Sequence, residues 1–199
     1  EEWYTVGERR SGRGGRVECT SPFPMDAKPL KGRHALVTGG TRGIGRAIAR
    51  ELAARGCDVA VNFFKSRGAA DDTVRELSGM GVRSFHVRAN VGNAEHVDRM
   101  FAKLKEEWGS LDIFVSNAAL GALKPLLELT LEDWERSMEI NARALLLGAQ
   151  RAVPLMEGRR GRIVSITSMG ADHVLPDYAA VGAAKAAMFM VKLMMAPAS

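Results

Sequence analysis

The chain of 199 residues has little cysteine and no long apolar run, which excludes several classes of protein. Its two cysteines, Cys19 and Cys57, are too few for a disulfide framework, and no C-x-x-C pair is present to bind a metal. No apolar run reaches the roughly 18 residues that a membrane-spanning helix needs. The first residues, Glu1-Glu2-Trp3-Tyr4, lack the basic start and apolar core of a signal peptide. We therefore expect a cytoplasmic protein with no membrane span and no metal site.

The excess of positive charge is also small. Lys and Arg number 28 against 23 Asp and Glu, which gives a net charge of +5. Outside the N-terminal tail and the run at 159–162 the basic residues are scattered, whereas a duplex-binding protein gathers them on one face. We therefore expect no nucleic-acid partner. The charge is compatible with a phosphorylated small molecule or with an acidic carrier protein.

The composition changes near residue 30. Residues 1–30 are polar and rich in glycine, with neither the period of a strand nor that of a helix, so we expect a disordered extension. A basic arm that binds nucleic acid is the alternative for this tail. Residues 31–199 are long enough, and at 46% hydrophobic residues in the whole chain apolar enough, to form one domain.

From residue 34 onward, short apolar runs alternate with helical patterns. One helix is indicated by Val97, Met100, Phe101, Leu104 and Trp108, whose spacing places them on one helix face. Another begins at Thr130, with Asp133 three residues on, as in a capping box. The alternation predicts an α/β fold with a doubly wound, Rossmann-like parallel sheet. The five predicted strands lie at 34–38, 58–63, 83–88, 111–116 and 162–166.

A glycine-rich turn follows the first strand, and a helix is expected from about residue 46 to 55. The turn reads Thr38-Gly39-Gly40-Thr41-Arg42-Gly43-Ile44-Gly45. Gly39 allows the sharp turn off the strand, Gly43 lets a diphosphate approach, and Gly45 permits close helix–strand packing. The helix N-terminus then offers amide groups to phosphate. The pattern predicts a dinucleotide site, and a glycine-rich connection without a ligand is the alternative.

The end of the second strand indicates which nicotinamide nucleotide is bound. An acidic residue there would favour NAD, because it hydrogen-bonds the ribose 2′-hydroxyl. The run Asn62-Phe63-Phe64-Lys65-Ser66-Arg67 contains no acid. Arg42, with Lys65 or Arg67, would hold a 2′-phosphate, so we expect NADP(H). The alternative is that these cations only solvate a surface loop.

An ordered set of motifs resembles the short-chain dehydrogenases/reductases over roughly residues 33–190. The set comprises the glycine turn, Asn90-Val91, Asn117-Ala118-Ala119, Asn141 and Ser168. The family usually has Asp where Asn90 stands, and Asn-Asn-Ala-Gly where this chain has residues 116–119. The resemblance also implies two further strands and a substrate-covering helix that this chain lacks, so we expect the sheet to have about five strands and the chain to be C-terminally incomplete.

The spacing of tyrosine and lysine departs from the ordinary family pattern. Ordinary members carry Tyr-x-x-x-Lys, but Val181 stands four residues before Lys185. The only tyrosine outside the tail is Tyr178, seven residues before the lysine. On a helix seven residues turn about 700° and rise about 10.5 Å, so both side chains share one face, with the phenol one turn further out. That position suits an extended conjugated thioester better than a ketone beside the nicotinamide.

Tyr-x6-Lys resembles the signature of bacterial enoyl-acyl-carrier-protein reductases, and the surrounding residues are similar to type III, an NADPH enzyme of fatty-acid elongation. The resemblance implies reduction of trans-2-enoyl thioesters carried by acyl carrier protein, and a homo-oligomer, usually a tetramer. It implies that Tyr178 stabilises the enolate, Lys185 holds the ribose, Asn141 holds water and Ser168 occupies the position of the catalytic serine. The implied cofactor residues are Gly39, Thr41, Arg42, Gly43, Ile44, Gly45, Phe64, Lys65, Asn90, Val91, Asn117, Ala118, Ala119 and Lys185.

Two other functions are consistent with the sequence. One is ordinary carbonyl or alcohol chemistry of the 3-ketoacyl or hydroxysteroid type, against which the missing tyrosine at position 181 argues. The other is a nucleotide-binding protein without catalysis, in which Tyr178 is a half-buried aromatic residue near a helix start and Ser168 is a simple hydroxyl at a strand end.

Overall fold

The computed structural model describes residues 28–194, and its centre is a five-stranded sheet in which every neighbouring pair is parallel. The strand order is β3-β2-β1-β4-β5. The expected doubly wound α/β fold is confirmed, and each predicted strand is present with ends shifted by no more than two residues. The strands are β1 (His34–Val37), β2 (Asp58–Phe63), β3 (Ser84–Arg88), β4 (Ile113–Ser116) and β5 (Arg162–Ser165).

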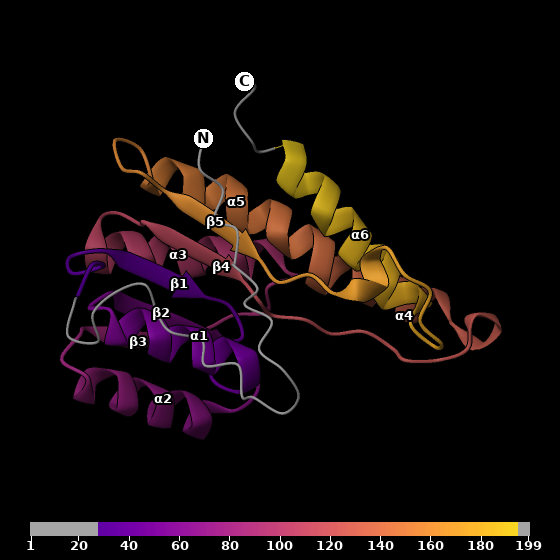
Figure 1. The fold of residues 1–199 in the computed structure, drawn as a ribbon, viewed down its shortest axis with the longest axis horizontal. Coiled ribbons are helices and arrows are strands. Elements are labelled where there is room, and N and C mark those ends of the chain that lie inside the picture. Colours follow the sequence, from indigo (N-terminus) through magenta and orange to yellow (C-terminus); the bar gives the residue numbers. More distant parts are fainter. Residues whose placement is uncertain (1–27, 195–199) are drawn as a thin grey trace, which may run out of the picture.

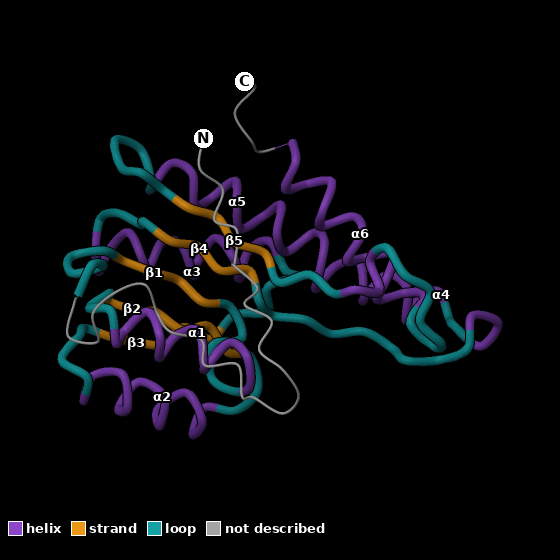
Figure 2. The backbone as a smooth tube through the Cα atoms, viewed as in Figure 1, coloured by secondary structure: helices purple, strands orange, loops and turns teal. Residues whose placement is uncertain are grey.

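Helices cover both faces of this sheet (Figures 1 and 2). The helices are α1 (Gly43–Ala54), α2 (Arg67–Gly79), α3 (Ala94–Trp108), α4 (Leu131–Met138), α5 (Ala144–Leu155) and α6 (Ala179–Met194). Short turns of other helix types lie at η1 (Leu126–Glu128), η2 (Glu139–Arg143) and η3 (Met169–Ala171). Because parallel strands need crossovers, α1, α2, α3 and α5 each return the chain to the beginning of the next strand.

Alternation along the strands builds two separate apolar layers. Leu36 and Ala60 face α3, α5 and α6, where Phe114 and Leu145 complete the buried cluster. Neighbouring strand residues such as Val37 face the opposite way, toward α1 and α2. The near-continuous apolar strands of the sequence are therefore explained by burial on both faces of the sheet.

The predicted helix signals are present in the structure. The face spaced from Val97 to Leu104 is buried against the sheet. Thr130 and Asp133 form the reciprocal capping box at the beginning of α4. α1 begins at Gly43, three residues earlier than predicted, so two glycines of the turn lie inside the helix.

The domain extends slightly further toward the N-terminus than predicted. Leu30 was assigned to the disordered extension, but its amide donates to the Arg55 carbonyl at 3.0 Å and its side chain packs against the α1 and α2 layer. Leu30 therefore belongs to the folded domain. The remaining predictions for the N-terminal tail, and those for 195–199, lie outside the described residues.

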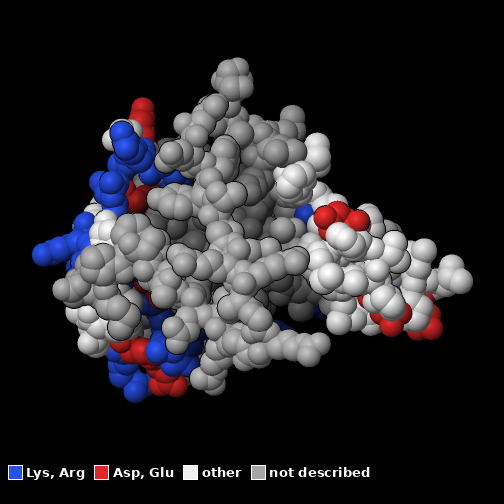
Figure 3. Space-filling view, viewed as in Figure 1, with Lys and Arg blue, Asp and Glu red and all other residues white. Residues whose placement is uncertain are grey.

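Charge is distributed unevenly along the molecule. In Figure 3, Lys and Arg gather toward the end at which the strands begin, while the projecting end formed by η1 and α4 shows mainly uncharged side chains and some Asp and Glu. Exposed apolar residues of that projection include Leu123, Leu126, Leu127 and Leu131. Within residues 28–194, no helix combines the length and apolar character that a bilayer crossing requires.

Candidate active site

The glycine turn joins β1 to α1 and places a helix N-terminus at the edge where the strands end (Figure 1). Gly39 and Gly43 adopt left-handed backbone conformations, with φ of +62° and +50°, which residues with a β-carbon rarely adopt. A β-carbon at Gly45 would collide with the carbonyl oxygen of Gly39 and lie 2.5 Å from Asn117 Nδ2. Each glycine of the motif therefore has a backbone reason for its position.

The first turn of α1 has donors suited to a diphosphate. Its N-cap residue, Arg42, makes no side-chain capping hydrogen bond, so the first amide groups of the helix lack that partner. Among the described residues, no atom beyond its chain neighbours and the backbone of its own helix lies within 4 Å of the position that a Gly43 β-carbon would occupy. Thr41 is buried beside the turn, and Ile44 is exposed on its outer side. The turn therefore fits a dinucleotide whose diphosphate rests on helix-terminal amides.

Beneath the turn, polar side chains join the ends of β1 and β4. Thr38 Oγ1 accepts hydrogen bonds from the amides of Asn117 and Ala118, at 2.9 and 3.1 Å. Asn117 Nδ2 donates to the Thr38 carbonyl at 2.8 Å. The predicted cofactor residues at 117–119 thus lie beside Gly39, where a β-carbon would be 3.1 Å from the Ala118 Cα atom.

Asn62 is a site residue that the sequence reasoning did not single out. Its side chain is buried at the end of β2, and its Oδ1 accepts a hydrogen bond from the Gly39 amide at 3.3 Å. Its Nδ2 donates to the carbonyl of Ala89 at 3.0 Å. Asn62 therefore ties the glycine turn to the end of β3. The available signal was a polar residue near the end of β2, after the apolar run 59–61.

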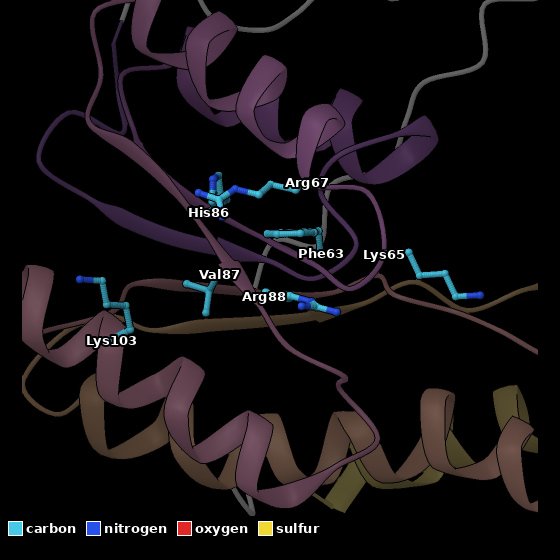
Figure 4. Close-up of a pocket in the computed structure, with 7 residues that line it drawn as sticks. All are labelled: Phe63, Lys65, Arg67, His86, Val87, Arg88 and Lys103. Atoms are coloured by element: carbon cyan, nitrogen blue, oxygen red, sulfur yellow. The ribbon is translucent and has the colours of Figure 1, made fainter.

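A cleft of about 520 Å³ opens where β2 and β3 end (Figure 4). Arg67 extends toward His86 and lies 3.9 Å from Asp71, which also pairs with His86 at 2.8 Å. Lys65 points elsewhere, and no ion pair of Lys65 is found within the described chain. Of Lys65 and Arg67, the two alternatives for a cation beside Arg42, Lys65 is therefore the one without an acidic partner in residues 28–194. The cleft is lined by Phe63, Lys65, Arg67, His86, Val87, Arg88 and Lys103.

Asn90 closes the turn after β3 with its own side chain. Its Oδ1 accepts from the Gly92 amide at 3.1 Å, and its backbone amide donates to His96 Nδ1 at 3.2 Å. Val91 is buried behind it. Asn90 thus fixes a short loop at the same sheet edge as the glycine turn, as a side chain of this size commonly does in turns.

Ser168 and Tyr178 are brought together across the loop that follows β5. The Tyr178 hydroxyl lies 3.2 Å from Ser168 Oγ, which also accepts the Gly170 amide at 3.3 Å. Tyr178 is immediately before α6 rather than inside it, and its carbonyl accepts the Gly182 amide at 2.7 Å, as the first helical bond. A cavity of about 440 Å³ adjoins Tyr178, with Leu126, Val174 and Leu175 among its lining residues.

Lys185 lies two helical turns further along, and its side chain is only 5% exposed. Its Nζ donates to the Ile166 carbonyl at 2.7 Å, which leaves two of its three protons without a protein acceptor in the described chain. Burial lowers the pKa of Lys185, because desolvation disfavours the charged form. Such an ammonium fits a position beneath the hydroxyls of a nucleotide ribose.

Asn141 lies in the π-helical turn η2, between α4 and α5. Its Nδ2 donates to the carbonyls of Leu120 and Ser137, at 2.6 and 2.7 Å. Its Oδ1 is buried and has no hydrogen-bond partner among the residues that the structure describes. A wide helical turn commonly marks a functional site, and an unsatisfied buried acceptor is suited to bind water.

Val181 occupies the position of the ordinary family tyrosine, and it is an apolar packing residue. Its side chain is 7% exposed and fills the space beside Gly121, where any β-carbon would collide with it. A β-carbon at Gly121 would also lie 2.9 Å from Ser137 Oγ. Val181 therefore packs directly against the loop at Gly121, and the phenol of this chain lies at position 178 instead.

Comparison with known proteins identifies the family. The family described as Enoyl-(Acyl carrier protein) reductase matches residues 39–197. A short-chain dehydrogenase from Burkholderia cenocepacia J2315, crystallised with NADP, is 38% identical and has a TM-score of 0.77. That similarity covers 81% of this chain and 66% of that one. This chain belongs to the short-chain dehydrogenase/reductase family.

Other members of the short-chain dehydrogenase/reductase family carry reductase names. The chain is 43% identical over 154 residues to 1-cyclohexenylcarbonyl-CoA reductase of Streptomyces collinus, covering 77% of this chain and 55% of that protein. It is 39% identical over 163 residues to hydroxynaphthalene reductase-like protein Arp2 of Metarhizium brunneum, covering 81% and 60%. The chain thus spans little more than half the length of these relatives. The expected fold and family are confirmed, and the crystallised NADP complex agrees with the expected cofactor.

Proposed function

We propose that this protein binds NADP(H) and reduces the carbon–carbon double bond of an enoyl thioester. The observation that carries the proposal is the joint position of four residues. Tyr178, directly before α6, reaches Ser168, while Lys185 is buried about two turns into α6 and an apolar Val181 fills the ordinary tyrosine position. Support also comes from the relative named 1-cyclohexenylcarbonyl-CoA reductase, since that name describes a thioester with a conjugated double bond.

The residues of the site fit the three parts of NADP(H): the diphosphate, the 2′-phosphate and the nicotinamide ribose. The uncapped N-terminus of α1 would hold the diphosphate, and Arg42 with Lys65 would hold the 2′-phosphate. Lys185 would hold the nicotinamide ribose through its two available protons. When bound, NADPH supplies the hydride that adds to the β-carbon of the substrate.

The protein residues act on the negative charge that develops on the thioester oxygen. Tyr178, with Ser168 beside it, donates a hydrogen bond to this enolate oxygen and stabilises it. One proton at the α-carbon, from the phenol or from water, completes the saturated thioester. Asn141, through its free Oδ1, would hold a water molecule behind Lys185.

A direct substrate comparison tests this proposal. The chain is mixed with NADPH and either crotonyl-CoA or acetoacetyl-CoA, and the absorbance at 340 nm is followed. Faster oxidation of NADPH in the presence of crotonyl-CoA supports enoyl reduction. Faster oxidation with acetoacetyl-CoA would instead assign carbonyl reduction, the second candidate, which the similarity to a hydroxynaphthalene reductase-like protein favours.

The carrier and the assembly are part of the same proposal. Crotonyl-acyl-carrier-protein is expected to be used at least as well as crotonyl-CoA. Self-association is supported by exposed apolar residues on α5 and α6, namely Leu146, Val153, Phe189 and Met190. Light scattering after size exclusion measures the assembly, and a monomer at micromolar concentration would contradict it.

A further inference from the structure

The residue before the phenol has an unusual backbone. Asp177 has φ of +57°, and it is the one non-glycine residue with positive φ among those that the structure describes. Its carbonyl accepts the Lys124 amide at 3.0 Å, which ties it to the loop between β4 and α4. The left-handed region is unfavourable for residues with a β-carbon, although Asn and Asp tolerate it better than most. The surrounding structure therefore imposes this conformation directly beside Tyr178.

The carboxylate of Asp177 does not account for its presence. Asp177 is exposed, and no hydrogen bond or ion pair of its side chain is found in residues 28–194. The feature that distinguishes this position is thus its backbone conformation. A left-handed residue changes the direction of the chain abruptly. Here the change falls between the loop that approaches α6 and Tyr178, whose carbonyl accepts the first hydrogen bond of the helix.

Gly170 provides the space into which the Tyr178 ring then packs. A β-carbon at Gly170 would collide with Cδ1 of the ring and lie 2.5 Å from Cε1. The same glycine donates its amide to Ser168 Oγ, the partner of the phenol. A β-carbon at Gly182 would lie 2.6 Å from the Gly170 carbonyl oxygen, so this loop also lies directly against α6.

We propose that Asp177 and Gly170 are positioning residues that direct the Tyr178 hydroxyl to Ser168. This inference rests on the proposed function, because the phenol matters only if it acts on substrate. The left-handed backbone of Asp177 turns Tyr178 toward the loop, and the missing side chain of Gly170 lets the ring lie close enough to reach the serine. Together they hold the Tyr178 phenol seven residues before Lys185. The ordinary position of the phenol, four residues before the lysine, is occupied by Val181.

The test uses a probe of the ring that does not depend on activity. The chain has two tyrosines, Tyr4 and Tyr178, so a Tyr4→Phe background labelled with 3-fluorotyrosine gives one fluorine resonance, from Tyr178. Asp177→Gly and Asp177→Asn, which tolerate left-handed φ, are expected to keep this resonance near its parental shift. Asp177→Val and Gly170→Ala are expected to move or broaden it. Gly68→Ala, at a position where a β-carbon meets nothing within 4 Å, is the matched control.

Turnover of crotonyl-CoA by the same variants is the second measurement. Asp177→Val and Gly170→Ala should lower kcat on the order of 10²-fold, as expected for a misplaced catalytic group, with little change in NADPH affinity. Asp177→Gly should retain most of the turnover. The positioning role is overturned if Asp177→Val and Gly170→Ala leave the fluorine resonance unchanged, or if Asp177→Gly loses as much turnover as Asp177→Val. If Asp177→Val does not fold, the positioning role is judged from Gly170→Ala and Asp177→Gly. If the fluorine resonance moves as expected but neither the parental protein nor any variant reduces crotonyl-CoA, the proposed function is rejected and the positioning of the ring is not.

Discussion

The Lys185 ammonium lies 2.7 Å from the carbonyl oxygen of Ile166. Ile166 is two residues before Ser168, whose hydroxyl is paired with Tyr178. The loop that leaves β5 therefore holds the lysine through its backbone and the phenol through a side chain. One short segment thus sets the relative positions of the two groups on which the proposed chemistry depends.

Removal of the lysine should affect both binding and turnover. Lys185→Ala is expected to weaken NADPH binding, measured by nucleotide fluorescence, and to lower kcat, because the buried ammonium contacts the ribose in the proposed complex. Lys105→Ala, on the exposed face of α3, is the control. Because burial lowers the pKa of Lys185, the lysine should lose its proton, and NADPH affinity should fall, at a pH below the usual lysine value of 10.5. Unchanged affinity in Lys185→Ala would contradict the ribose contact.

Removal of the phenol should separate chemistry from binding. Tyr178→Phe keeps the ring against Gly170 but cannot donate to an enolate oxygen, so kcat for crotonyl-CoA should fall by about 10²–10³-fold. NADPH affinity should change by less than about twofold, since the hydroxyl has no proposed contact with the cofactor. If Tyr178→Phe retained full turnover, the seven-residue spacing would be incidental and the assignment to enoyl reduction would be withdrawn.

Two cations should discriminate between NADPH and NADH. Arg42→Ala and Lys65→Ala are each expected to weaken NADPH about tenfold, the cost of losing one charge-assisted hydrogen bond, and to leave NADH affinity unchanged. Arg67→Ala is the matched control, because that side chain extends toward His86 and Asp71. An equal loss of both nucleotides would show that Arg42 or Lys65 has a structural role instead.

The left-handed glycine of the turn should tolerate no branched side chain. Gly43→Val is expected to lower the free energy of unfolding by about 1–2 kcal/mol, because valine is forced into positive φ. It should also abolish NADPH binding, since the side chain projects into the open space before α1. Urea unfolding and fluorescence titration measure the two effects. Normal NADPH binding by a folded Gly43→Val would contradict the phosphate site.

At the opposite end of the sheet, Asp112 should make stability depend on pH. Burial alone would raise its pKa, but hydrogen bonds from Arg159 and Arg33, both at 2.7 Å, lower it to about 2. The unfolded protein therefore binds this proton more readily, so the contribution is present above the ordinary value of 3.8 and is lost as the pH falls toward 2.

Asp112→Asn tests the contribution of the Asp112 carboxylate and its two arginines to stability at neutral pH. The variant is expected to lose about 3 kcal/mol of unfolding free energy, because two arginines lose a buried anionic partner. Urea unfolding of both proteins between pH 2 and 7 provides the measurement. A parental protein whose stability does not fall faster than that of Asp112→Asn below pH 4 would contradict the assignment.

Local patterns in the sequence determined the fold class and most of the nucleotide site. Strand and helix periods reflect which faces are buried, and the spacing of Gly39, Gly43 and Gly45 reflects backbone constraints that act within one turn. The distance of seven residues between Tyr178 and Lys185 could likewise be counted directly. These features were predictable because their causes lie within a few residues of one another.

Only the tertiary structure decided which polar groups meet across the sheet. Asn62 contacts Gly39, and Lys185 contacts Ile166, through register and crossover geometry that no local pattern encodes. The pairing of Asp71 of α2 with His86 of β3 is also set by the tertiary structure, whereas the contact of Arg67 with Asp71 is an i,i+4 pair within α2. The left-handed backbone of Asp177 is imposed by the packing of two loops against α6, because aspartate alone has no preference strong enough to adopt it.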